Sequence, residues 1–424
     1  MPTLFWVAIV LFIATYAIII SEKIHRTVIA LTGAILMILL GIIHQEQAIE
    51  GIDFNTLGLL IGMMIIVGIA KDSGMFQYVA IWASKVAKGK PLYIFLLLSF
   101  LVSLFSALLD NVTTVLLMVP VMFVVANNLK IHPKPFLIST ILLSNIGGTA
   151  TLIGDPPNIL IGSAANLSFN AFLSHLAPIA FVCVFITLGL LYFIYKKDLV
   201  TTPEAEASIM QFHPSEALTD RKLLKKSLFV LGVVLIGFFT HSITHIEGAT
   251  IALGGAALLL LLTMNDPENH LKEVEWTTIF FFIGLFVLVA GLEHVGAIRM
   301  MAEKVLEVTA GNMTATTLVI LWGSAFFSAV VDNIPFVATM IPLIKDIGAI
   351  SGLALGPLWW ALALGADIGG NATIVGASAN VVVSGMAEKH GHRIGFGEYM
   401  KIAVPLTFVA LIVCTIYVYL RYLI

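Results

Sequence analysis

The sequence has few charged residues, and this shortage decides its class. Only 11% of the 424 residues are charged, whereas 59% are hydrophobic, and the mean hydropathy is +1.03. A soluble domain of this length would have too few charged side chains for its surface, while a protein that crosses a bilayer many times needs this balance. We therefore predict an all-α membrane protein of the cell (inner) membrane.

Cysteine is nearly absent too. Cys183 and Cys414 both lie in apolar runs, so we expect free thiols and no disulfide framework. They do not correspond in the repeat described below, which argues against a thiolate cage. Residues 1–20 lack a basic segment and a small-residue cleavage site, which favours a retained span over a signal peptide.

Motifs of other protein classes are missing as well. The sequence has no HExxH, GxSxG, Walker or dinucleotide-binding motif in a suitable context, so we predict no enzyme and no cofactor. The net charge of -3 argues against a nucleic-acid partner. His241 and His245 lie four residues apart at the end of a span, and we interpret them as ordinary surface residues.

One apolar stretch contains residues that break helices. Residues 143–161 read LSNIGGTATLIGDPPNILI, and glycines and prolines such as Gly148 and Pro156 cannot all lie in one continuous helix. In lipid, a broken backbone survives only where protein or a water-filled cavity satisfies its freed N–H and C=O groups, and transporter sites are built in this way. This stretch is therefore our first candidate for a binding site.

The same pattern returns 222 positions later. Residues 364–385 read LGADIGGNATIVGASANVVVSG, and the spacing continues upstream without a gap, which implies two copies of one fold. The pairs include Gly147 and Gly369, Thr151 and Thr373, Asn158 and Asn380, Asp110 and Asp332, Asn111 and Asn333, Pro120 and Pro342, Gly62 and Gly284, and Ala30 and Ala252.

The repeat defines the expected domains. We predict a first repeat at 1–195, a cytoplasmic linker at 196–226 and a second repeat at 227–424. Each repeat should hold about five spans and a hairpin, with an amphipathic stretch before the hairpin. The predicted ranges in the two repeats are 4–20 and 227–243, 27–43 and 249–264, and 55–71 and 277–292 for the first spans, 92–128 and 314–347 for the hairpins, 137–162 and 358–385 for the broken helices, and 174–195 and 400–420 for the closing spans.

The hairpin segment could be two full spans or one re-entrant hairpin, but in both cases it returns to its own side. Each repeat then crosses the bilayer an odd number of times, so the two repeats lie upside down relative to each other. In such inverted repeats the binding site is expected at the midplane, where the repeats meet.

Basic residues favour an orientation with both termini external. Loops near 21–26, 71–91, 129–135, 196–226, 265–275 and 386–401 hold 18 of the 22 basic residues, which places these loops in the cytoplasm. The remaining four are Arg299, Lys304, Lys345 and Arg421. The loop at 265–275 fits poorly because it carries more acidic than basic residues, yet acidic residues count for little in this rule.

At this point the chain resembles a known family. The Asp110-Asn111 hairpin, the GGTATLIGDPPN run from Gly147 to Asn158, and their repeats look like the ion transporter superfamily, and within it the ArsB/NhaD permeases. The GDPPN form is most similar to the branch with the P-protein permeases and many bacterial proteins labelled as arsenical pumps. The resemblance implies secondary transport, an elevator-like movement, a homodimer and, as in arsenical pumps, a soluble ATPase partner.

Asp110 and Asp332 lie inside long apolar runs. An ionised aspartate near the centre of a membrane helix costs roughly 2.5 to 3.5 kcal/mol, which suggests a use. One interpretation is that each Asp-Asn pair caps the following half-helix. The other adds ion or proton binding, because a carboxylate in a partly dry cavity can exchange a proton for a cation.

Asp155 and Asp367 rank second, because they break the internal symmetry. Asp155 matches Ala377, and Asp367 matches Asn145. Direct function and the lining or capping of the site both remain open for them. The glycines either allow a ligand to approach the backbone or serve helix packing.

We predict that substrate and coupling ion bind at the hairpin tips and broken helices, through carboxylates, amides, hydroxyls and helix ends. The candidates are Asp110, Asn111, Thr113, Gly148, Thr149, Thr151, Asp155, Asn158, Asp332, Asn333, Asp367, Gly370, Asn371, Thr373 and Asn380. A sodium ion would use Asp110, Asn111, Asn158, Asp332, Asn333 and Asn380.

These expectations combine into one function with alternatives. The first is an antiporter that exports arsenite or antimonite, a small inorganic substrate, against a proton or sodium gradient, with hydroxyls and amides binding the neutral hydroxide. The alternatives are a sodium/proton antiporter and a sodium-coupled, dicarboxylate-like anion carrier. An ion channel would need a continuous pore and no coupled carboxylates, and the paired broken helices argue against it.

Overall fold

Helices are the only regular secondary structure over the residues that the computed structural model describes, which are 2–21, 23–264 and 266–424. Within these ranges ten helices are long and apolar enough to cross a membrane, so the all-α membrane fold expected from composition is confirmed. Residues 1, 22 and 265 lie outside the described residues, although the predicted first repeat and the predicted loops at 21–26 and 265–275 include them.

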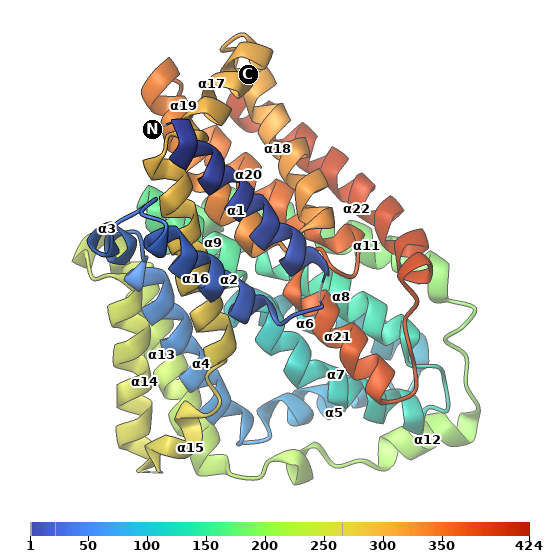
Figure 1. Ribbon diagram of the computed structural model, residues 1–424. Helices are drawn as coiled ribbons and strands as arrows, with labels where there is room; N and C mark the ends of the chain where they lie inside the picture. Colours follow the sequence, from blue (N-terminus) through green and yellow to red (C-terminus); the bar gives the residue numbers. More distant parts are fainter. Residues whose placement is uncertain (1, 22, 265) are drawn as a thin grey trace.

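The helices follow one another with short connections (Figure 1). The first part of the chain forms α1 (Pro2–Ser21), α2 (Arg26–Leu39), α3 (Gln45–Glu50), α4 (Phe54–Lys71), α5 (Met75–Val86), α6 (Pro91–Leu108), α7 (Asn111–Asn128), α8 (Lys134–Gly148), α9 (Pro156–Ala165), α10 (Phe169–His175) and α11 (Ala177–Tyr195). The remainder forms α12 (Pro203–Gln211), a 3₁₀ turn (Pro214–Ala217), α13 (Arg221–Thr244), α14 (Gly248–Thr263), α15 (Pro267–Leu271), α16 (Trp276–His294), α17 (Ala297–Thr309), α18 (Met313–Val330), α19 (Asn333–Ser351), α20 (Gly356–Gly369), α21 (Ser378–Lys389) and α22 (Phe396–Val418).

The two parts have the same helix order. The first residues of α2 and α14, of α4 and α16, of α7 and α19, and of α9 and α21 are each 222 positions apart, the spacing already seen in the sequence. Figure 1 shows α1 beginning and α22 ending toward the same end of the molecule.

Glycines allow the helices of the two repeats to cross closely. A Cβ atom on Gly62 of α4 would lie 2.4 Å from the carbonyl carbon of Ala252 in α14. The equivalent crossing joins Gly284 of α16 to Ala30 of α2, at 2.6 Å. Small residues permit such backbone contact between membrane helices. These crossings build a scaffold from α1, α2, α4, α13, α14 and α16 in which each repeat holds helices of the other.

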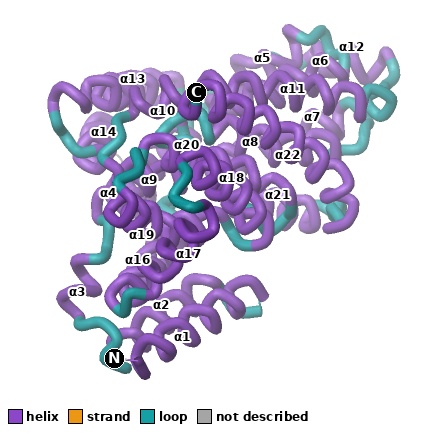
Figure 2. The backbone as a smooth tube through the Cα atoms, turned by 90° about the horizontal axis from the view of Figure 1, so that it is seen from above, coloured by secondary structure: helices purple, strands orange, loops and turns teal. Residues whose placement is uncertain are grey.

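The remaining long helices form a second group, the hairpin unit, which contains α6–α9, α11 and α18–α22. Figure 2 shows the scaffold helices α1, α2, α13 and α14 on one side and α6, α7, α11, α21 and α22 on the other. The breaks between α8 and α9 and between α20 and α21 lie toward the middle of the molecule, so this arrangement positions the predicted site.

Each hairpin is fastened to the broken helix of its own repeat. Ser106 of α6 donates a hydrogen bond to the Ser144 carbonyl at 2.6 Å, and Thr151 donates to the Ala107 carbonyl at 2.5 Å. The second repeat has the same pair of bonds, from Ser328 to the Ala366 carbonyl and from Thr373 to the Ala329 carbonyl. The tips therefore lie beside the breaks, an arrangement that fits the expected re-entrant hairpin.

The segment between the repeats differs in detail from the expected linker. It contains the short helix α12, and α13 begins at Arg221, earlier than the expected span start at 227. The Asp220 side chain accepts hydrogen bonds from the backbone N–H groups of Lys222 and Leu223 and so caps α13. A polar N-terminal turn of this kind cannot be seen in hydropathy.

Candidate functional site

In each broken helix, an asparagine side chain donates hydrogen bonds to backbone carbonyls at the break. The amide nitrogen of Asn158 in α9 lies 3.3, 3.3 and 3.0 Å from the carbonyl oxygens of Gly148, Thr149 and Thr151. Asn380 in α21 does the same in the second repeat, with bonds to the Gly370 and Thr373 carbonyls at 2.7 and 2.8 Å. The last carbonyls of a helix have no partner within it, so these amides satisfy groups that lipid could not.

Asn145 of α8 joins the two repeats at the centre of the molecule. Its amide nitrogen donates to the side-chain oxygens of Asn371 and Asn380, both at 2.8 Å. Its oxygen accepts from the amide of Asn111 at the first hairpin tip, at 3.1 Å. Asn145 is fully buried, so this amide network lies in the dry interior.

Asp155, the N-cap of α9, lies between the two hairpin tips. One carboxylate oxygen accepts from the amide of Asn111 at 2.7 Å, and the other accepts from the amide of Asn333 at 3.4 Å. Asn111 and Asn333 are equivalent residues of the two repeats, and Asp155 itself is fully buried. One carboxylate thus bridges both repeats.

Asp367 of α20 is also fully buried, but neither carboxylate oxygen has a hydrogen-bond partner among the described residues. Thr149 and Asn158 are the polar side chains beside it. The side-chain oxygen of Asn158 is likewise buried and unpartnered. Three buried acceptor oxygens on these two side chains therefore have no hydrogen-bond donor among the described residues. Buried polar groups without a partner are energetically costly.

The Asn145–Asn380 hydrogen bond shows how the same two positions are satisfied in the other copy of the repeat. Asn145 and Asp367 are equivalent, and so are Asn380 and Asn158. The oxygen of Asn380 accepts from the amide of Asn145, whereas the oxygen of Asn158 has no donor among the described residues. By the internal repeat, Asp367 stands in the position of Asn145, and an ionised carboxylate cannot donate. A proton on Asp367, or a cation between Asp367 and Asn158, would complete the arrangement.

Asp110 and Asp332 do lie at the hairpin tips. Asp110 is the N-cap of α7 and accepts from the backbone N–H of Thr113 at 2.7 Å. Asp332 caps α19 through the N–H of Ile334 and also forms an ion pair with Arg26 at 2.9 Å. The capping geometry of both residues is present, and their role in ion binding stays a prediction.

The predicted threonines contribute less than expected. The hydroxyls of Thr149, Thr151 and Thr373 all donate to backbone carbonyls, and all three side chains are buried. Gly148 and Gly370 contribute carbonyl oxygens, which Asn158 and Asn380 already use. The hydroxyls are thus not free donors for a solute.

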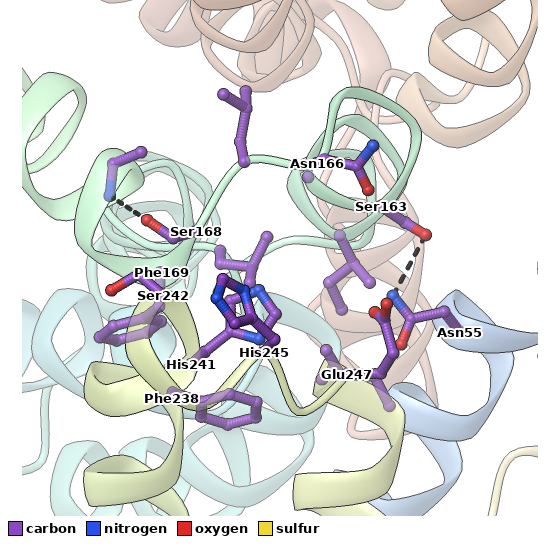
Figure 3. A pocket seen from close by; sticks show the side chains of 17 residues that line it. Asn55, Ser163, Asn166, Ser168, Phe169, Phe238, His241, Ser242, His245 and Glu247 are labelled. Atoms are coloured by element: carbon purple, nitrogen blue, oxygen red, sulfur yellow. Dashed lines mark hydrogen bonds between the residues drawn. The ribbon is translucent and has the colours of Figure 1, made fainter.

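Two cavities approach the breaks from opposite ends of the scaffold. The Glu247 cavity, of about 680 Å³, is lined by Asn55, Ser163, Asn166, His241, His245 and Glu247 and reaches Leu152 at the first break. Figure 3 shows these side chains around one space, with the hydrogen bond from Asn55 to Ser163. The Arg26 cavity, of about 380 Å³, reaches Val375 and Ser378 at the second break.

The opposite positions of the cavities follow from helix direction. Helices α4 and α14 run parallel, because Asn55 bonds to the N–H of Ala249 at one end and Lys71 pairs with Glu273 at the other. The chain leaves α2 at the Asn55 end, so Arg26, at the start of α2, lies at the other end.

The structure brings most of the predicted residues together and adds three polar residues that were not among the candidates. The amide network and the carboxylates come together as the broken helices predicted. Asn145, Arg26 and Ser378 were not among the candidates, although Asn145 is the counterpart of Asp367 and Arg26 is a cation at the start of an apolar span. A test of each polar residue against its repeat counterpart would have found them.

The two cysteines meet away from this site. Cys183 of α11 and Cys414 of α22 are buried free thiols, as expected, and their sulfur atoms lie 3.9 Å apart. The two cysteines are not repeat counterparts, so matching positions 222 residues apart does not predict that they are close. They meet because α11 and α22 pack against each other across the two repeats.

Comparison with known proteins places the whole chain among transporters. The sequence model of a citrate transporter family (CitMHS) matches residues 16–365. An uncharacterized transporter of Mycobacterium tuberculosis is 42% identical over 424 residues, which cover 98% of each chain. The human P protein is 33% identical over 495 residues, which cover 97% of this chain and 59% of that protein.

Solved structures share the fold. The YdaH transporter of Alcanivorax borkumensis has a TM-score of 0.63 at 14% identity and covers 94% of this chain and 99% of its own. MtrF of Neisseria gonorrhoeae, described as illuminating a class of antimetabolite efflux pumps, has a TM-score of 0.62 at 15% identity and covers 92% of this chain and 85% of its own. At these identities the likeness shows the fold alone.

Proposed function

Because the chain belongs to the citrate transporter family of membrane transporters, we propose that it is a cation-coupled secondary transporter whose coupling carboxylates are Asp367 and Asp155. The family and the relatives are transporters, not enzymes, so the proposal concerns what is carried and by which residues. The exchange of sodium for protons is the first candidate.

The observation that carries this proposal is the unpartnered oxygens of Asp367 and Asn158. A proton on the carboxylate would supply the donor that the Asn158 oxygen lacks, and a sodium ion would accept both side chains as oxygen ligands. The two ions therefore compete for one position. Competition of this kind at a buried carboxylate is the basis of antiport.

The charge around the site also favours a cation. Asp110, Asp155, Asp332 and Asp367 lie at the tips and breaks, and Arg26 is the one basic residue paired with them among the described residues. This excess of negative charge would repel a free polyanion. The dicarboxylate-like alternative is accordingly less well supported than cation exchange.

Arsenite or antimonite export remains the second candidate, because Asn111, Asn145, Asn371 and Asn380 gather polar amides where a small neutral hydroxide could bind. Against it, the threonine hydroxyls already donate to the backbone. The amides also satisfy one another. A trihydroxide would have to displace these bonds, whereas a cation would complete the site.

We further propose that the hairpin unit moves against the scaffold as in an elevator. The two cavities support this proposal, since each runs to a break from a different end of the scaffold and the carboxylates between them are buried. A rigid-body shift of one unit against the other would expose the site to each side in turn.

The function is tested with purified protein in liposomes that contain a pH-sensitive dye. An inward sodium gradient should drive protons out, and this signal should need no arsenite. Arsenite accumulation driven by a proton gradient, without any sodium-dependent proton movement, would replace the first candidate with the second. Ion leak independent of any gradient coupling would overturn both in favour of a channel.

Orientation is a separate prediction, motivated by the basic residues of the loops. Ser215 and His390 should be cytoplasmic, and Ser168, at the rim of the Glu247 cavity, should be external. Each is replaced by cysteine in a background with Cys183 and Cys414 changed to alanine, and intact cells are treated with an impermeant thiol reagent. Reaction at position 215 but not at 168 would reverse the assignment.

A further inference from the structure

Arg26 connects the scaffold to the hairpin tip and the broken helix of the second repeat. Its guanidinium lies 2.9 Å from the carboxylate of Asp332 at the hairpin tip and 2.7 Å from the hydroxyl of Ser378 at the start of α21. Ser378 also donates to Asp332, at 2.6 Å. The guanidinium carbon lies 5.0 Å from the centre of the Phe281 ring in α16. One side chain thus joins α2, a hairpin tip and a broken helix.

The first repeat has no equivalent of this contact. The counterpart of Arg26 is Gly248, and that of Ser378 is Pro156. Asp110, the counterpart of Asp332, has only the backbone N–H of Thr113 as a hydrogen-bond partner within the described ranges. The ion pair therefore ties the second hairpin tip to the scaffold, and no matching ion pair holds the first hairpin tip among the described residues.

A second polar contact shares this asymmetry. The hydroxyl of Tyr16 in α1 donates to the Pro335 carbonyl at 2.9 Å and lies 3.1 Å from the hydroxyl of Thr339. The counterpart of Tyr16 is Phe238, whose ring stacks on Phe169. The polar contacts of Arg26 and of Tyr16 thus both reach the Asp332 hairpin.

The position of Arg26 allows its ion pair to hold the hairpin tip against the scaffold. Arg26, Asp332 and Ser378 line the Arg26 cavity at the second break. The side chains of Arg26 and Asp332 are 30% and 12% exposed, so the pair is shielded from water more than a surface pair. Charge-assisted bonds of this geometry are strong, and they must break before the hairpin can leave the scaffold.

Asp332 needs a counter-ion in this setting, but the counter-ion does not have to be Arg26. A free cation in the cavity could neutralise the carboxylate equally well. Glu275 lines the same cavity and offers the released guanidinium a second carboxylate. The cavity therefore contains one carboxylate that a free cation could neutralise and a second carboxylate that could pair with the released guanidinium.

We propose that Arg26 is a tethered cation that clamps this end of the transporter shut, and that a cation arriving through the Arg26 cavity opens it by replacing the guanidinium at Asp332. The clamp follows from the contacts alone, whereas its release by a cation rests on the proposed function. The clamp is a gate outside the central site of Asp155 and Asp367.

The test measures access to each cavity and does not need transport. In the background with Cys183 and Cys414 changed to alanine, a reporter cysteine replaces Val375 in the Arg26 cavity or Ser163 in the Glu247 cavity. The rate of reaction with a small maleimide is followed in liposomes. Arg26→Gln should raise the rate at position 375 about 10-fold and lower it at position 163.

Two control variants separate the clamp from a general effect of charge. Arg26→Lys keeps a cation at the site and should leave both rates near those of the parent. Arg299→Gln removes an arginine of a surface pair with Glu303 and should change neither. If Arg26→Gln fails to fold, judged by size-exclusion chromatography, Asp332→Asn removes the other half of the pair and carries the same expectation.

The outcomes distinguish the clamp from the coupling. An unchanged rate at position 375 in folded Arg26→Gln or Asp332→Asn overturns the clamp, whatever is found for transport. Sodium should raise that rate in the parent and have no further effect in Arg26→Gln. A rate that rises in Arg26→Gln but ignores sodium and protons in the parent keeps the clamp and overturns its release by a cation.

Discussion

Asp367→Asn is expected to abolish sodium-driven proton movement in liposomes while leaving the protein at least as stable as the parent. The carboxylate makes no hydrogen bond with the described residues, so the amide loses no contact. The amide nitrogen can instead donate to the Asn158 oxygen, as Asn145 donates to Asn380 in the other repeat. What disappears is the titratable charge, and with it the competition between proton and sodium.

This combination is measured by transport and by thermal unfolding on the same preparations. A matched control is Asp198→Asn, an exposed aspartate near the end of α11, which should keep full exchange. Loss of stability in Asp367→Asn would mean that the carboxylate has partners that the structure does not give it. Full exchange in this variant would remove Asp367 from the mechanism.

Asn158→Ala and Asn380→Ala should both destabilise the protein, yet only the first should weaken sodium binding more than stability explains. Each substitution removes the amide that satisfies carbonyls at the end of a half-helix, at a cost of about 1–3 kcal/mol in a dry interior. The Asn158 oxygen has no partner among the described residues and corresponds, by the internal repeat, to the Asn380 oxygen, which accepts from Asn145.

The measurement compares the unfolding free energy in detergent with the sodium concentration at half-maximal exchange. Asn158→Ala should raise that concentration about 10-fold, which corresponds to roughly 1.4 kcal/mol of binding free energy. Asn380→Ala should shift it far less. Equal shifts in the two variants would show that the breaks matter only as structure and that Asn158 is not a ligand.

Much of the fold could be predicted because its signals are local. Apolar runs gave the spans, and the glycines and prolines near Gly148 and Pro156 gave a break that the structure places between α8 and α9. The 222-residue spacing gave the inverted repeat. The start of α13 was misplaced, since its first turn is polar and is held by the Asp220 cap.

The site was harder, because its partners come from distant parts of the chain. Asp110 and Asp332 stood out as charges within apolar sequence, so they ranked above Asp155 and Asp367. The structure buries the second pair completely and gives the Asp367 carboxylate no hydrogen-bond partner among the described residues, whereas the carboxylates of the first pair both cap helices. Whether a polar atom at the site has a hydrogen-bond partner depends on how α8, α9, α20 and both hairpins pack together. A short stretch of sequence contains no information about that packing.

Because the helices of the two repeats are equally spaced in the sequence, a substitution in one repeat can be compared with the same substitution in the other. A residue in α2 to α9 has a counterpart 222 positions later in a helix that starts at the matching residue, but with the opposite direction relative to the bilayer. When the same substitution is made separately at each of the two positions, the local backbone geometry is similar but the neighbouring side chains differ. Equal effects then report helix packing, and unequal effects report sidedness or chemistry, within a single polypeptide and without any comparison between species.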